Sequence, residues 1–285
     1  MAKKLVLSLE EQNKIINDYM SGISLRDLVK KCGHSRSFLS KFLKEKNVVI
    51  RDNSINSRKY FHDEDFFEKI NTEEKAYWLG FLYADGFIQS KRTTGNQQFG
   101  ITLKSADKRH LEKFRKAIKA NNPINHYKGS GYNKNGDFVR IQLTSQKTVN
   151  DLKEKGIVEN KTLKLKFPSE EIVPKKLINH FIRGYFDGDG SLSYWTRYGK
   201  TKTLRNYLLG FTGMEDVLQG ILEYFNKTNI VIKPHNNAYE FNIGGNCQLK
   251  NILNLLYKDA HVYLDRKKCI YDDYLKYVER QGVIG

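Results

Sequence analysis

The sequence predicts an α+β protein with two similar repeats, preceded by a small unit made only of helices. The repeats are indicated by two apolar stretches, 77–86 and 181–190, each with one glycine in its middle and Asp-Gly at its end. The aspartates of these Asp-Gly pairs, Asp85 and Asp189, lie 189 − 85 = 104 positions apart, a spacing that suits two copies of a small α/β unit. Polar and apolar residues alternate after each stretch, as they do in strands of a sheet that is covered on one side.

The composition limits the partners of the chain. Its 285 residues are 39% hydrophobic, enough for a core, and carry a net charge of +17 with a sequence pI near 9.5. This excess indicates a polyanionic partner, with nucleic acid as the first candidate and an anionic membrane surface as the second. We favour double-stranded DNA and expect no membrane partner, because no apolar run approaches the ~20 residues of a membrane span. The three cysteines form no Cys-x-x-Cys pair, and we expect a cytoplasmic protein with reduced thiols.

Residues 1–48 are predicted to form a helix-turn-helix DNA-binding domain. Ser8 and Glu11 have the spacing of a capping box, and a turn at Gly33 separates the second helix from the third. The third helix leaves a basic, polar face outward, composed of Arg36, Ser37, Ser40, Lys41 and Lys44. A three-helix bundle that contacts other proteins is the alternative. Residues 49–71 are expected to form a basic linker, which either follows a DNA backbone or is a solvated tether.

The first repeat is predicted at 72–168. Thr72 caps its apolar helix, and helices follow at 108–119 and 146–155. The strands around residues 98–104 and 139–144 are apolar on one face. Their other face supplies six candidate DNA contacts, namely Gln98, Thr102, Lys104, Arg140, Gln142 and Thr144. Ordinary solvation is the alternative explanation of this face.

The second repeat is predicted at 169–285. Its apolar helix starts near Pro174, and strands are expected at 191–198, 204–212, 230–232 and 239–243. The candidate DNA contacts on these strands are Ser193, Trp195, Arg197, Lys202, Arg205, Asn206, Glu240 and Asn242. The alternation is less regular here than in the first repeat.

The two aspartates suggest a metal site. Gly80 and Gly184 allow the two apolar helices to pack closely, which brings Asp85 and Asp189 together. Neighbouring carboxylates repel each other unless a cation joins them, and Mg²⁺ prefers such oxygen ligands. We expect two or three Mg²⁺ ions shared by the two aspartates, a site suited to phosphodiester hydrolysis. A plain turn at each helix end is the alternative, and a calcium loop at 187–191 is less favoured because its downstream Glu is missing.

The segments 78–86 and 182–190 resemble the conserved nonapeptide of the LAGLIDADG homing endonucleases, and the resemblance covers residues 72–280. It implies two pseudo-symmetric αββαββα units, with antiparallel saddle-shaped sheets that lie in the DNA major groove. It also implies metal-dependent cleavage at the centre, with metal ligands from Asp85, Asp189 and the backbone carbonyls of Ala84 and Gly188.

The same resemblance implies a catalytic basic residue near each site. These residues are Lys161 and Lys267, with Arg266 or Lys268 as alternatives for the second. The sequence departs from the family pattern at Tyr83, where an aspartate is common, so that helix end must be stabilised in another way.

The resemblance therefore predicts a monomeric, site-specific DNA endonuclease of the homing type that cuts both strands of a long, non-palindromic target. A transcription regulator of the same fold without cleavage, and an intron RNA maturase, are the alternatives. The regulator is less favoured because both motif aspartates are present.

Overall fold

A computed structural model describes residues 7–50, 59–90, 96–129, 135–159, 165–198 and 203–280. The chain divides into two compact units, Met1–Lys59 and Tyr60–Gly285. Within the described ranges, no helix is both long enough and apolar enough to cross a membrane.

The N-terminal unit consists of helices α1 (Leu9–Met20), α2 (Leu25–Cys32) and α3 (Arg36–Glu45). The predicted capping box at the start of α1 is confirmed, since Ser8 and Glu11 each accept a hydrogen bond from the other's backbone N–H. Gly33 ends α2 with a positive φ of 73°, which glycine adopts without strain. The three helices share a core of their own, formed by Leu7, Ile15, Tyr19, Leu25, Leu28, Leu39, Phe42 and Leu43.

The expected linker at 49–71 is too long at its C-terminal end. Phe66, Phe67 and Ile70 are buried in the core of the larger unit, and Asp63 N–H donates to the carbonyl of Ile118 at 2.8 Å. Residues 60–71 therefore belong to the larger unit. Their polar composition concealed the three apolar side chains, which contact elements distant in sequence.

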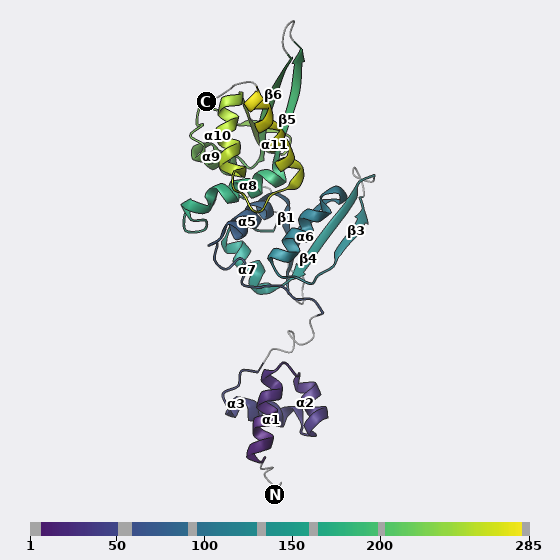
Figure 1. Ribbon diagram of the computed structural model, residues 1–285. Coiled ribbons are helices and arrows are strands. Elements are labelled where there is room, and N and C mark those ends of the chain that lie inside the picture. Colours follow the sequence, from purple (N-terminus) through teal and green to yellow (C-terminus); the bar gives the residue numbers. More distant parts are fainter. Residues whose placement is uncertain are drawn as a thin grey trace. The chain divides into compact units, whose positions relative to one another are not determined.

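The larger unit contains the two predicted αββαββα repeats (Figure 1). The elements of the first repeat are α5 (Glu73–Asp85), β1 (Gly86–Ile88), β2 (Gln98–Lys104), α6 (Lys108–Ala117), β3 (Ile124–Lys128), β4 (Asp137–Thr144) and α7 (Gln146–Glu154). Those of the second are α8 (Ile178–Asp189), β5 (Gly190–Tyr198), β6 (Thr203–Gly213), α9 (Glu215–Tyr224), β7 (Lys233–His235), β8 (Ala238–Gly244) and α10 (Asn246–Tyr257), with α11 (Asp265–Arg280) after them. The strand expected at 230–232 is wrong, because the strand of this region is β7.

Each repeat folds its strands into one antiparallel sheet, in the orders β1-β2-β4-β3 and β5-β6-β8-β7. Helices α6 and α7 pack on the first sheet, and α9 and α10 pack on the second. The inward side chains of the first sheet are buried as the alternation predicts, and include Phe99, Ile101, Val139 and Ile141. The polar face of each sheet is consequently the face away from these helices.

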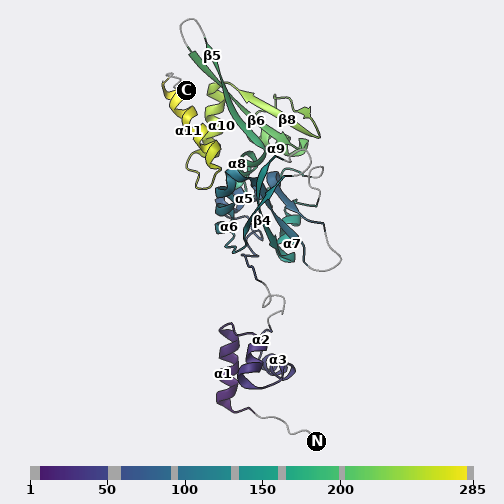
Figure 2. The ribbon, with the colours of Figure 1, turned by 90° about the vertical axis from the view of Figure 1, so that its right-hand side faces the viewer.

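Helices α5 and α8 lie side by side where the two repeats meet (Figures 1 and 2). A Cβ atom at Gly80 would collide with the backbone carbonyl of Phe181, and one at Gly184 would collide with the carbonyl of Tyr77. The two glycines thus allow the helix backbones to touch, and each does so against the equivalent part of the other helix. This reciprocal contact has the geometry of a two-fold interface.

Candidate active site

Helices α5 and α8 end at Asp85 and Asp189, and these ends lie next to each other. A Cβ atom at Gly188 would overlap the Cβ of Ala84 and would lie 3.3 Å from Oδ2 of Asp85. Asp85 is half-buried and Asp189 is exposed. The close packing at the two central glycines therefore continues to the helix ends, and the Asp85 carboxylate lies beside Gly188, the residue before Asp189.

The oxygen atoms at this junction fit a hard divalent cation. Two carboxylates lie at helix C-termini, where the backbone carbonyls carry partial negative charge. The carbonyls of Ala84 and Gly188 are among them. No described group of three or more His, Cys, Asp or Glu side chains is arranged to hold a metal ion. A cation here would accordingly take only part of its ligands from side chains, as Mg²⁺ commonly does.

Lys267, at the start of α11, reaches the same place from the second repeat. Its buried ammonium donates to the carbonyls of Asp187 at 3.0 Å and Gly190 at 2.6 Å, and also to that of Phe186. Burial lowers the pKa of Lys267 to about 8, while the Asp187 carboxylate and, to a lesser extent, those at the two helix ends oppose the shift. Lys267 is thus not a solvated surface lysine, because it holds the last carbonyls of α8.

The alternative basic residues point elsewhere. Arg266 donates to Asp107 at 3.2 Å, and Lys268 donates to Asp272 at 2.5 Å. Of these three neighbours, Lys267 is the one directed to the helix end. Lys161, the expected basic residue of the first repeat, lies outside the described residues.

Asp187 lies two residues before the end of α8 and is fully buried. Its carboxylate accepts hydrogen bonds from the hydroxyls of Tyr77, at 2.7 Å, and Tyr257, and from the backbone N–H of Leu264 at 2.7 Å. Burial raises the pKa of Asp187 above its usual range, although Lys267 and these three donors oppose the shift. The carboxylate therefore joins α5, α8, α10 and the segment before α11.

The two tyrosines of this network were not singled out from the sequence. A buried carboxylate needs donors to offset its desolvation, so the motif predicts that partners exist. It does not predict which residues they are, because Tyr77 and Tyr257 are 110 and 70 positions from Asp187.

Tyr83 occupies the equivalent position at the end of α5. Its hydroxyl donates to the backbone carbonyl of Lys155, in the segment after α7. The departure from the family pattern is therefore accommodated by a donor in place of an acceptor, and the helix end is still tied to the segment that follows the last helix of its repeat.

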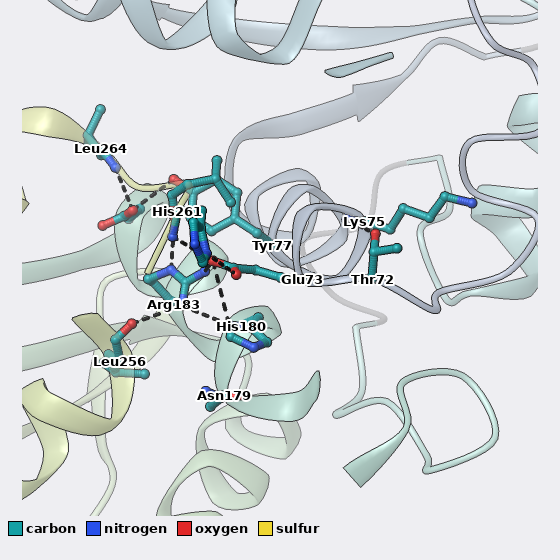
Figure 3. Close-up of polar contacts among 12 residues, drawn as sticks. Thr72, Glu73, Lys75, Tyr77, Asn179, His180, Arg183, Leu256, His261 and Leu264 are labelled. Carbon is teal, nitrogen blue, oxygen red and sulfur yellow. Dashed lines mark hydrogen bonds and ion pairs between the residues drawn. The ribbon is translucent and has the colours of Figure 1, made fainter. Parts of the chain in front are cut away.

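A second polar cluster joins the start of α5 to the middle of α8 (Figure 3). Arg183 of α8 is 1% exposed and donates to Glu73 of α5 at 2.7 Å and to the carbonyls of Leu256 and Val262 at 2.9 Å each. Glu73 also accepts from the backbone N–H of His261 at 2.9 Å. The cluster fixes the α10–α11 connection, and with it the approach to Lys267, against the start of α5.

The polar face of the first sheet collects all six of its predicted residues. In the register of β2 and β4, Thr102 pairs with Arg140 and Gln98 pairs with Thr144, while Gln142 stands opposite Gly100. Arg140 donates to Thr102 at 2.9 Å and Gln142 donates to Gln98 at 2.6 Å. Lys104 is exposed at the end of β2.

The second sheet arranges its predicted residues less completely. One face carries Ser193, Trp195, Arg197, Asn206, Glu240 and Asn242. Arg205, also predicted as a DNA contact, lies on the opposite face, because neighbouring residues of a strand point to opposite sides. Its guanidinium instead lies 4.8 Å from the ring of Tyr194, and its backbone N–H donates to Tyr277 of α11 at 2.8 Å. Lys202 lies outside the described residues.

The third helix of the N-terminal unit has the predicted outward face. Arg36, Ser37, Lys41 and Lys44 are exposed and Ser40 is half-buried. They lie opposite the buried side chains of α3, which are Leu39, Phe42 and Leu43. The DNA-binding role of this face stays a prediction.

Comparison with known proteins identifies the fold. No protein-family model and no curated protein matches the sequence. Solved structures do match: the I-LtrWI LAGLIDADG homing endonuclease bound to target DNA has a TM-score of 0.54 at 12% identity, over 74% of this chain and 91% of that one. The LAGLIDADG meganuclease I-AabMI bound to uncleaved DNA has a TM-score of 0.51 at 15% identity, over 73% and 91%. I-CpaMI, also bound to uncleaved DNA, has 0.50 at 15%, over 70% and 89%.

The chain therefore has the fold of the LAGLIDADG homing endonucleases. Its two repeats are the two halves of that fold, and the helices that end at Asp85 and Asp189 are the pair that joins them.

Proposed function

We propose that the protein is a single-chain, metal-dependent endonuclease that cuts both strands of double-stranded DNA at a long, non-palindromic target. The observation that carries this proposal is the pair of neighbouring helix ends, each with a carboxylate as its last side chain and each followed directly by the first strand of a polar sheet. The shared fold and the net charge of +17 support it.

Asp85 and Asp189 would hold the divalent cations, together with the carbonyls of Ala84 and Gly188. Mg²⁺, as two or three ions, would supply activation of water and stabilisation of the leaving 3′-oxygen. The acidic helix ends would set where the phosphodiester lies, because oxygen ligands from both repeats meet there. Lys267 fixes one helix end through its carbonyls and adds positive charge beside the reacting phosphate, and we propose the corresponding role for Lys161.

The polar sheet faces would dock in the major groove, with the sheet residues described above as contacts. Because the two faces carry different side chains, the two half-sites would differ in sequence. We propose that the N-terminal helices form a helix-turn-helix that binds adjoining DNA through α3. A chain that carries both halves needs no partner subunit to complete the site, so it would act as a monomer.

The test is selection of cleaved duplexes from a random library with Mg²⁺, followed by cutting of the selected target. We expect Asp85→Asn and Asp189→Asn each to reduce double-strand cutting by at least about 100-fold while binding persists. Asp216→Asn, at an exposed aspartate of α9, is the matched control and should cut normally. Sequence-specific binding by the wild-type chain, with no cutting in any divalent metal, would instead identify a regulator that binds DNA without cleaving it.

A further inference from the structure

One arginine on the polar face of the first sheet is held on three sides. Arg140 donates from Nε to the hydroxyl of Thr102 at 2.9 Å. The central carbon of its guanidinium lies 5.1 Å from the ring centroid of Phe87 and 5.0 Å from that of Tyr127. These distances are within the range of cation–π contacts, so two aromatic rings and one hydroxyl define the position of the planar group.

The three holding residues come from three different strands. Thr102 is on β2, Phe87 on β1 and Tyr127 on β3, while Arg140 itself is on β4, between β2 and β3. The arrangement is thus a property of the folded sheet and not of one flexible segment. In the part of the chain that the structure describes, no carboxylate forms an ion pair with Arg140.

The contacts leave a specific set of donors. An arginine has five N–H groups, and Thr102 engages the one on Nε, so the two terminal nitrogens keep a parallel pair of donors. A ligand for that pair must present two acceptors side by side. In the major groove the O6 and N7 atoms of guanine form such a pair, and arginine is their commonest partner.

The neighbouring side chains separate this role from simple phosphate binding. Contact with a phosphate does not require a fixed plane, and exposed Lys104 at the end of β2 is suited to it. Arg140 lies on an inner strand. The aromatic rings already restrict its side chain, so Arg140 would lose less conformational freedom on binding than an unrestrained arginine. Fixing the guanidinium plane favours recognition of a base edge.

We propose that Arg140 reads a guanine in the half of the target that faces the first sheet. The inference rests on the proposed function, since it assumes that this face enters the major groove. Phe87, which packs on Arg140, is the second residue after Asp85, so the guanine belongs to the inner part of the half-site, near the cut.

The experiment is selection of bound duplexes from a random library without divalent cations, using the wild-type chain, Arg140→Ala and Arg140→Lys. The wild-type chain should prefer guanine at one inner position by about 5- to 150-fold over other bases. Arg140→Ala should lose the preference at that position alone. Arg140→Lys, which keeps the charge but not the paired donors, should also lose most of it.

Lys104→Ala is the control for a phosphate contact, and should weaken binding to all sequences equally and lower the slope of log K against log salt by about 1. If Arg140→Ala behaves like Lys104→Ala, the guanine inference is overturned while the proposed DNA binding stands. If the wild-type chain selects no sequence, the proposed function fails and the inference fails with it.

A second pair of variants tests the aromatic support. Tyr127→Leu keeps Arg140 but removes one ring, and should reduce the guanine preference by several-fold without abolishing binding. Tyr194→Leu is matched to it, because Tyr194 also lies against an arginine, but on the other face of the second sheet. An equal effect of both substitutions on the guanine preference would contradict the proposed support.

Discussion

The ends of helices α5 and α8 are held in equivalent ways, but by hydrogen bonds of opposite direction. At the end of α5, Tyr83 donates a hydrogen bond to the carbonyl of Lys155. At the end of α8, Asp187 accepts one from the N–H of Leu264, together with two from tyrosines. The fold therefore requires a link from each helix end to the segment after the last helix of the repeat, and it tolerates either a donor or an acceptor.

The sheets differ in a similar way. The first begins with β1, of 3 residues, whereas the second begins with β5, of 9 residues, which pairs with β6 in a long hairpin (Figure 2). The polar face of the first sheet is interlinked by hydrogen bonds, while the second exposes Trp195 by 53% and Leu204 by 40%. One architecture thus carries two chemically different surfaces, while the glycine contacts between the repeats are equivalent.

The largest expected effect tests that equivalence at the interface. Gly80→Ala and Gly184→Ala should each destabilise the larger unit by about 3 kcal/mol or more, because the added methyl meets a backbone carbonyl that cannot move aside. Urea unfolding followed by tryptophan fluorescence reports on this unit, since Trp78 and Trp195 are the only tryptophans of the chain. Gly244→Ala, where the nearest atom is 3.8 Å away, should change stability little. Unequal losses at the two interface glycines would contradict the two-fold description.

The next prediction separates the two helix ends. Asp187→Asn should cost about 3 kcal/mol, because it leaves the buried Lys267 ammonium without its charge partner and confronts three donors with an amide. Tyr83→Phe removes one neutral hydrogen bond and should cost about 1 kcal/mol. The same fluorescence-monitored unfolding measures both variants. Equal losses of stability would show that the buried charge of Asp187 matters no more than the neutral hydrogen bond of Tyr83.

A further prediction concerns a buried histidine of the first repeat, which lies against helix α5. His110 of α6 lies 2.9 Å from the Tyr77 hydroxyl, and burial lowers its pKa to about 3. Because the Tyr77 hydroxyl donates to Asp187, its oxygen is left to accept from Nε2 of His110, and the lowered pKa keeps the imidazole neutral. Helix α9, in the corresponding position of the second repeat, contains no histidine.

The sign of the pH effect follows from the lowered pKa. The unfolded chain binds a proton at His110 below its ordinary pKa of about 6.5, whereas the folded chain does not until about pH 3. As the pH is lowered from about 6.5 to about 3, this group should therefore reduce the free energy of unfolding by about 1.4 kcal/mol for each pH unit. In His110→Phe, the unfolded chain binds one proton fewer in this pH range, so the slope of unfolding free energy against pH should be smaller by about 1.4 kcal/mol per pH unit. An unchanged slope would refute the neutral buried imidazole.

Much of the fold could be predicted because its signals are local. The caps at Ser8 and Thr72 and the alternation around Ile101 each depend on residues only a few positions apart, and the structure confirms them. The misassigned segments, 60–71 and 230–232, are those in which contacts distant in sequence decide the structure. Phe67 is buried in the core of the larger unit, and β7 is defined by its pairing with β8.

The candidate site could be predicted in part for the same reason. Asp85 and Asp189 could be paired because each ends a recognisable helix with a central glycine. Tyr77 and Tyr257 could not, since a buried carboxylate accepts donors from any segment that the fold brings near it. Arg205 and its neighbour Asn206 were both predicted as DNA contacts, although neighbouring residues of a strand face opposite sides, and only Asn206 shares a face with Trp195.

The ion pair between Glu73 and Arg183 also decides which halves can be combined. By the spacing of 184 − 80 = 104 between the interface glycines, the counterpart of Glu73 is Leu177 and that of Arg183 is Leu79. Two copies of the first repeat would leave half-buried glutamates without an arginine, and two copies of the second would bury arginines without a glutamate. The ion pair thus forms only between unlike halves, so engineered chimeras should keep Glu73 in one half and Arg183 in the other.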